Sequence, residues 1–173
     1  MAFTYETTLV KNEDSSLMWY YMIPVPLEIA VQLKEVSKRV LCQINEGNTF
    51  HAALTPDGAG NDFVLVNKER RKQLKIDVGD NIKVNIETDH TKYGMTVPDV
   101  FPPMCEQDPE GSKLFHDLTP GKQRSLLHIM GKPKGEQKQL EKALIIFEHL
   151  KEVNGELDFK ALNVAFKESR FKL

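Results

Sequence analysis

Short stretches in the first half of the chain alternate between apolar and polar residues, which is the pattern of a β-strand with one buried face. Between two of these stretches lies Pro56-Asp57-Gly58-Ala59-Gly60-Asn61, whose residue types favour a tight turn and predict a hairpin. Six strands are predicted in this way, over residues 3–9, 19–23, 40–44, 50–54, 63–66 and 82–86.

Two short helices are predicted between these strands. The first covers Pro26–Leu33 and begins at a proline, which suits the first position of a helix. The second covers Lys68–Leu74. The first half of the chain therefore has the order strand, helix, strand twice.

The two strand–helix–strand segments match each other in spacing. The segment from Val25 overlays on the segment from Val66 at an offset of 41, and the strand from Val40 overlays on the strand from Ile82 at an offset of 42. A duplicated unit of this kind would close on itself as a compact barrel that protects most of its strand edges. The alternative is that generic spacing of apolar residues produces the same offsets by coincidence. The sequence leaves both interpretations, duplication and coincidence, open.

The pattern changes at Thr96, after which four prolines fall within a stretch that lacks sustained periodicity. We predict a Pro-rich linker over residues 98–112, which separates a barrel domain of residues 1–97 from a helical tail of residues 113–173.

Apolar residues in the tail follow the period of a helix, and three short amphipathic helices are predicted there. Thr119-Pro120 predicts the start of the first, because it combines an N-cap residue with a proline at the first helical position. Asn154-Gly155 predicts the end of the second, and Asp158 predicts the N-cap of the third.

Composition and charge narrow the classes of function. The chain has 173 residues, of which 40% are apolar and 28% charged, and this is typical of a folded globular protein. Its net charge of −2 gives no overall attraction for nucleic acid, so such binding would need a local basic patch. No apolar run approaches the length of a membrane-spanning helix and the N-terminus lacks the features of a signal peptide, so we expect a cytoplasmic protein.

Residues that carry chemistry are sparse. Cys42 and Cys105 form no C-x-x-C pair, and the five histidines show no metal-ligand spacing. Cys42 alternates with apolar residues and is expected in the core. We expect no cofactor, no metal ion and no catalytic residue.

The second predicted helix is the most basic part of the chain. It and the residue after it carry five cations within eight residues, which suffices for several phosphate contacts if they share one face. Successive residues of a helix point about 100° apart, so a solvated helix with one or two structural ion pairs is the other interpretation. The cations are Lys68, Arg70, Arg71, Lys72 and Lys75.

Two arginines at similar places in the repeat favour a structural role. We predict that Arg39 and Arg71 pair with Asp80 or Asp89, because a bidentate arginine–carboxylate pair fixes local geometry well. Gly79 permits a tight turn before the last strand, and Asp80 is suited to accept hydrogen bonds from backbone N–H groups of that turn.

The basic helix, the turn Val78-Gly79-Asp80 and the alternating strand after it resemble AbrB/MazE-type swapped-hairpin and split-barrel proteins. In that group each of two chains often contributes half of the barrel. Here the repeat would supply both halves from one chain.

A second resemblance covers nearly the whole chain. The barrel segment and the tail segments Asp108-Pro109-Glu110-Gly111 and Leu118-Thr119-Pro120-Gly121-Lys122-Gln123-Arg124 resemble the bacterial YdeI/OmpD-associated, bacteriocin-protection-like family, whose N-terminal domain is a split barrel of unknown function. The resemblance implies an α+β protein: a six-stranded double-split β-barrel with two short helices, followed by a small C-terminal helical tail. The barrel residues that carry it are Arg39, Asn45, Gly47, Arg71, Gly79, Asp80 and Asp89.

The tail departs from that family in one respect. Family tails commonly carry arginines after an Ala/Gly-Lys pair, whereas this chain reads Gly135-Glu136-Gln137-Lys138-Gln139-Leu140-Glu141-Lys142. If those arginines bind an anionic partner, lysines replace them without a planar, bidentate donor.

Three hypotheses for function follow. The first is a non-catalytic cytosolic protein that binds a macromolecular partner, a protein in preference to nucleic acid, and the resemblance links it to bacteriocin protection or stress. The second is a nucleic-acid binder that uses Lys68–Lys75. The third is a small-ligand or enzymatic site between barrel and tail.

Overall fold

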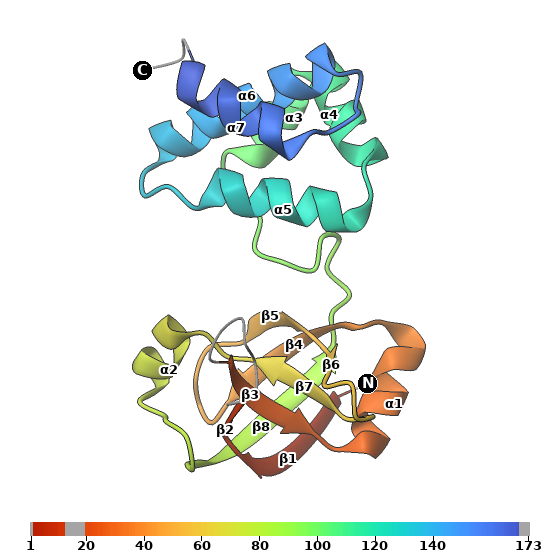
Figure 1. The fold of residues 1–173 in the computed structure, drawn as a ribbon, viewed down its shortest axis with the longest axis vertical. Coiled ribbons are helices and arrows are strands. Elements are labelled where there is room, and N and C mark those ends of the chain that lie inside the picture. The colour runs from red at the N-terminus through yellow and green to blue at the C-terminus, as the bar shows by residue number, and fades with distance from the viewer. Residues whose placement is uncertain (1, 13–19, 170–173) are drawn as a thin grey trace. The chain divides into compact units, whose positions relative to one another are not determined.

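The structure, a computed structural model, describes residues 2–12 and 20–169. The chain forms two compact units, Met1–Met95 and Thr96–Leu173, which we call the two-sheet unit and the helical unit (Figure 1). Trp19 of the predicted second strand lies outside the described residues.

Two antiparallel sheets of four strands make up the described part of the two-sheet unit. Sheet A has the order β1 (Ala2–Thr8), β8 (Asn81–Thr88), β4 (Arg39–Ile44), β5 (Phe50–Ala53). Sheet B has the order β2 (Val10–Asn12), β3 (Tyr20–Val25), β7 (Asp62–Leu65), β6 (Thr55–Pro56).

The prediction of a six-stranded double-split barrel is wrong, because these sheets do not close into a barrel. Two predicted strands, 3–9 and 50–54, are each followed by a short strand of the other sheet that was not predicted. After Leu9 the chain passes from β1 in sheet A to β2 in sheet B, and after Leu54 it passes from β5 in sheet A to β6 in sheet B. Both leucines are buried, with 0% and 3% of their surface exposed. A strand that bends to join a second sheet keeps its period of two, so the apolar pattern does not reveal the change of partner.

The predicted duplication is present in the structure. β3, α1 (Leu27–Val36) and β4 form one unit, and β7, α2 (Lys68–Leu74) and β8 form the other. Each runs from sheet B through a helix to sheet A. In sheet B Ile23 pairs with Val64, at the offset of 41, and in sheet A Gln43 pairs with Asn85, at the offset of 42. Equivalent residues of the two repeats therefore face each other across an internal pseudo-two-fold axis.

One hydrophobic core lies between the sheets. The inward positions of β4 and β8 alternate with half-buried or exposed residues, as the sequence pattern predicted. Cys42 is among the buried residues, and burial raises the pKa of its thiol to about 12. It is therefore an uncharged core residue at neutral pH, as expected from its position.

Helix α6 is the centre of the helical unit and contacts the other four helices described there (Figure 1). Phe101, Phe115 and Phe147 pack together in its core; the first two ring centroids are 4.7 Å apart. The helices are α3 (Phe101–Gln107), α4 (Pro109–Asp117), α5 (Pro120–Gly131), α6 (Glu136–Glu152) and α7 (Phe159–Glu168).

Helix α3 and the start of α4 occupy residues that were predicted to be a linker. Three of the four prolines there, Pro102, Pro103 and Pro109, lie in the first turns of these helices, where a missing N–H costs no hydrogen bond, and Pro98 precedes α3. Asp108 caps α4 by accepting a hydrogen bond from the Gly111 N–H at 2.9 Å. These prolines therefore mark the starts of helices. Because several prolines fall within a short stretch, the helical period of its apolar residues was not recognised in the sequence.

Replacing Gly111 by alanine is expected to destabilise the helical unit. The added Cβ would lie 2.5 Å from Cδ2 of the buried Phe147 ring and 2.9 Å from Oδ2 of Asp108. Forcing a methyl group into such a packed site costs about 1–3 kcal/mol. Chemical denaturation of the full chain measures this loss. Gly121→Ala, a control in α5 with no atom within 4 Å of the new Cβ, should leave the stability equal or raise it by up to about 1 kcal/mol; equal losses in the two variants would contradict the packing described.

Candidate functional site

Helix α2 is short and defined at both ends. Asn67 caps it by accepting a hydrogen bond from the Arg70 N–H at 2.8 Å. It ends at Lys75, whose backbone is left-handed with φ 54°. These two ends hold α2 in place on the two-sheet unit, together with two arginine side chains.

Arg71 packs α2 against sheet B. Its guanidinium carbon lies 3.2 Å from the centroid of the Tyr21 ring, and its Nη1 lies 3.0 Å from Oδ1 of Asp77. Its carboxylate partner is thus Asp77, whereas the sequence predicted Asp80 or Asp89. Asp80 instead accepts a hydrogen bond from the Asp77 N–H at 2.7 Å, which confirms its predicted role in the turn.

Arg70 packs α2 against sheet A. Its guanidinium carbon lies 3.6 Å from the centroid of the Phe50 ring. Among the described residues, no carboxylate forms an ion pair with Arg70. Burial lowers the pKa of its guanidinium below the ordinary value, but an arginine remains charged at any physiological pH. Arg70 is therefore a half-buried cation whose N–H groups are available to a ligand.

Arg70 faces a hollow of about 500 Å³ beside α2, which we call the α2 hollow. Asn48, Thr49 and Gln73 give it exposed polar groups. Among the described residues that line it, Arg70 is the one that carries a charge; they are Gly47, Asn48, Thr49, Phe50, Arg70, Gln73 and Leu74.

Gly47 shapes this hollow through a close approach. A Cβ at this position would lie 2.2 Å from Cδ2 of Leu74 and 3.1 Å from the Ile44 carbonyl oxygen. A side chain at position 47 would therefore have to displace the Leu74 side chain of α2.

The five cations of the predicted nucleic-acid site divide into two groups. Arg70 and Arg71 are stacked on aromatic rings. Lys68, Lys72 and Lys75 are exposed, and none of them lines the α2 hollow.

A row of polar side chains crosses the outer face of sheet A. Thr4, Asn85 and Gln43 lie opposite one another on β1, β8 and β4. Thr4 Oγ1 donates to Asn85 Oδ1 at 2.7 Å, Asn85 Nδ2 donates to Gln43 Oε1 at 2.9 Å, and Gln43 Nε2 donates to the Gly47 carbonyl at 2.9 Å. We call these three side chains the amide row. The amide row was not predicted from the sequence, although Gln43 and Asn85 occupy equivalent positions of the repeat.

Two turns account for the family-motif residues at the ends of β4 and β8. Asn45 has φ 51°, and its Oδ1 accepts a hydrogen bond from the Lys83 N–H at 3.0 Å. Gly79 has φ 91°, which confirms the tight turn predicted before β8. These residues shape the turn after β4 and the turn before β8.

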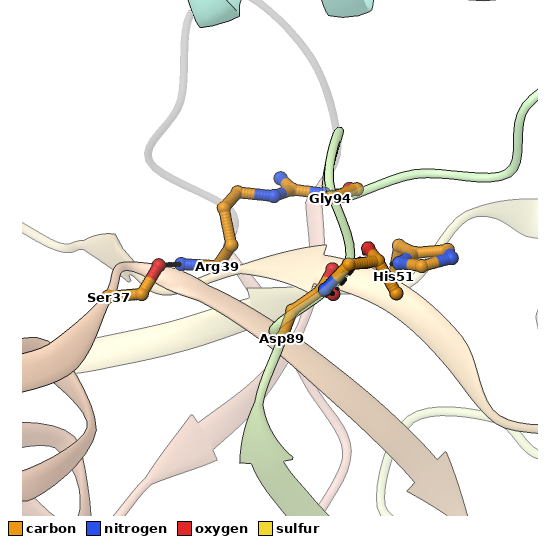
Figure 2. A network of polar contacts seen from close by, with 6 residues as sticks. Ser37, Arg39, His51, Asp89 and Gly94 are labelled. Carbon is orange, nitrogen blue, oxygen red and sulfur yellow. Dashed lines mark hydrogen bonds and ion pairs between the residues drawn. The ribbon is translucent and has the colours of Figure 1, made fainter.

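Arg39 and Asp89 belong to a separate network at the end of β8 (Figure 2). Asp89 Oδ2 lies 2.7 Å from Nδ1 of His51, and Thr91 donates to Asp89 through its N–H and its hydroxyl. The Arg39 guanidinium donates to the Gly94 carbonyl. The network holds the chain at the point where it leaves sheet A. Within it, the carboxylate of Asp89 pairs with His51.

The comparisons identify one domain. Residues 5–86 match the family described as Domain of unknown function (DUF1905), so the two-sheet unit contains this uncharacterised domain. No curated protein and no solved structure matches the chain.

Neither a metal-ligating cluster nor a membrane-spanning helix is found among the described residues. Within residues 2–12 and 20–169, no three His, Cys, Asp or Glu side chains are grouped so that they could hold a metal ion. No helix in this part of the chain is long and apolar enough to cross a membrane.

Asp89→Asn is expected to lower stability in a pH-dependent way. Burial raises the pKa of the Asp89 carboxyl, but hydrogen bonds from Thr91 and His51 outweigh this effect and hold the pKa below its ordinary value. The ionised carboxylate therefore stabilises the fold above its unfolded pKa of about 4, and this contribution is lost as the pH falls through the lower, folded pKa.

Urea denaturation at several pH values tests this expectation. Asp89→Asn should lose about 1–3 kcal/mol at pH 7 and approach the wild type in acid. Glu87→Gln, at an exposed position of β8 two residues before Asp89, is the control and should change little. A loss in Asp89→Asn that is independent of pH would show that charge is not its cause.

Proposed function

We propose that this protein is a non-catalytic binding module whose two-sheet unit recognises an anionic group of a partner molecule in the α2 hollow. The observation that carries the proposal is Arg70: its guanidinium is stacked on Phe50, and no carboxylate among the described residues pairs with it.

The geometry of Arg70 suits an anion. A guanidinium is planar and carries five N–H donors, and stacking on a ring covers its face while its edge stays free to donate. A carboxylate or a phosphate accepts two parallel hydrogen bonds from such an edge. Asn48, Thr49 and Gln73 supply further polar groups around it. Since Arg70 is half-buried, attraction to an anion there is screened less than at an open surface.

A protein partner fits this site better than nucleic acid does. Each strand of a DNA duplex carries one phosphate per about 3.4 Å of helix axis, whereas the described residues that line the α2 hollow include one cation. A protein can present a single carboxylate. The exposed Lys68, Lys72 and Lys75 keep nucleic-acid binding as the alternative.

The proposal also includes a biological role for the binding module. The resemblance of the tail to the YdeI/OmpD-associated family supports a role in bacteriocin protection or stress. That role would require a binding partner and no chemistry.

Arg70→Gln is expected to weaken anion binding at the α2 hollow. Backbone amide NMR of the full chain, titrated with sodium acetate and separately with inorganic phosphate at low ionic strength, should show saturable shifts at residues 47–50 and in α2. The substitution removes the charge and the bidentate edge, so affinity should fall at least about tenfold, equivalent to about 1.4 kcal/mol.

Lys72→Gln is the matched control, because it removes the same charge from the same helix outside the hollow. It should leave the titration unchanged. Equal weakening in both variants would contradict a specific site. Oligonucleotide binding that depends steeply on salt and is lost on replacing the three lysines would favour the nucleic-acid alternative.

A further inference from the structure

Three hollows of the two-sheet unit lie next to one another along sheet A and share lining residues. The α2 hollow shares Thr49 with a second hollow of about 280 Å³. The second shares Gln43 and Asn85 with a third hollow of about 660 Å³. We call the three together the sheet A groove. The amide row lies along it, and Arg70 lies at one end.

The amide row keeps hydrogen-bonding capacity for a ligand. Asn85 and Gln43 each use one N–H and one oxygen lone pair within the row. A side-chain amide carries two N–H donors and an oxygen with two lone pairs. Each therefore has one donor and one acceptor left, which is the complement of a peptide group.

The charges along the groove disfavour a polyanion. Beyond Arg70 its lining includes one cation, Lys83, and two carboxylates, Glu46 and Glu87. A strand of nucleic acid would place phosphates beside those carboxylates. A peptide with a single anionic group would be attracted by Arg70. Its uncharged remainder would not be repelled by Glu46 and Glu87.

The groove also offers an apolar contact and a suitable length. The half-buried Leu41 lies beside the amides in the second hollow, whereas Phe3 and Ile86, which also line it, have their side chains on the inward face of sheet A. Neighbouring strands are about 4.8 Å apart, so the amide row spans about 10 Å from β1 to β4, the length of about three extended residues. A polar row of this length with one apolar neighbour suits the main chain of an extended peptide.

We infer that the sheet A groove binds an extended peptide segment that places a carboxylate on Arg70 and lays its main chain along the amide row. The inference rests on the proposed function, which supplies the anion site, and adds the class of ligand. The carboxylate has two sources in a protein, a chain end and an acidic side chain.

Fluorescence anisotropy with the full chain tests this inference. The probe is an N-terminally labelled hexapeptide of alternating serine and alanine. It is used with a free C-terminal carboxylate, with a C-terminal amide, and with glutamate before a C-terminal amide. The first or the third form should bind at least about tenfold more tightly than acetate, and the plain amide should bind weakly. Whichever acidic form binds identifies the source of the carboxylate.

Variants separate this inference from the proposed function. Asn85→Ala and, at the far end of the row, Thr4→Val should weaken the peptide at least about fivefold and leave acetate binding unchanged, while Arg70→Gln weakens both. Glu6→Gln, on the same strand as Thr4 but outside the groove, is the control, and thermal unfolding verifies that each variant is folded. If acetate binds through Arg70 but the peptides bind no better and ignore both row variants, the inference is overturned and the proposed function stands. If neither ligand binds, both fail.

Discussion

Two adjacent arginines join α2 to both sheets. Residues next to each other on a helix point about 100° apart, so Arg70 reaches the Phe50 ring in sheet A and Arg71 reaches the Tyr21 ring in sheet B. Asp77 neutralises Arg71. Arg70 has the same stacking contact but no carboxylate partner among the described residues. Arg71 therefore has a structural role. Arg70 is held in a fixed position, and its charge is available to a ligand.

The internal duplication determines what surrounds that charge. Each repeat carries the chain from sheet B through a helix to sheet A, and equivalent strands pair with each other. Gln43 and Asn85 face each other for this reason, and their amides hydrogen-bond across the pseudo-two-fold axis. The two helices differ, since α1 lacks arginine and α2 contains the pair. The symmetry of the repeat thus places Gln43 and Asn85 of the amide row opposite each other. Arg70 of α2 has no counterpart in α1, so a single cation lies at one end of the sheet A groove.

Local features of the fold could be predicted from the sequence, and long-range ones could not. The bounds of α2, the turn at Gly79 and the cap at Asp158 depend on neighbouring residues, and the structure has all three. The change of sheet after Leu9 and Leu54 leaves the period of two intact, so it was missed. The α2 hollow needs Phe50 to meet Arg70 through the fold, and no spacing encodes this contact.

The state of Arg70 is the central claim, and side-chain NMR measures it most directly. In a protein labelled with ¹⁵N at arginine, the Nε–Hε resonances of Arg70 and Arg71 are assigned by their loss in Arg70→Lys and Arg71→Lys. Both should be resolved, because stacking restricts both guanidinium groups. Adding acetate should shift the Arg70 resonance and leave that of Arg71, which is paired with Asp77, in place. An Arg70 resonance that acetate does not move, or that moves together with Arg71, would contradict an available anion site beside α2.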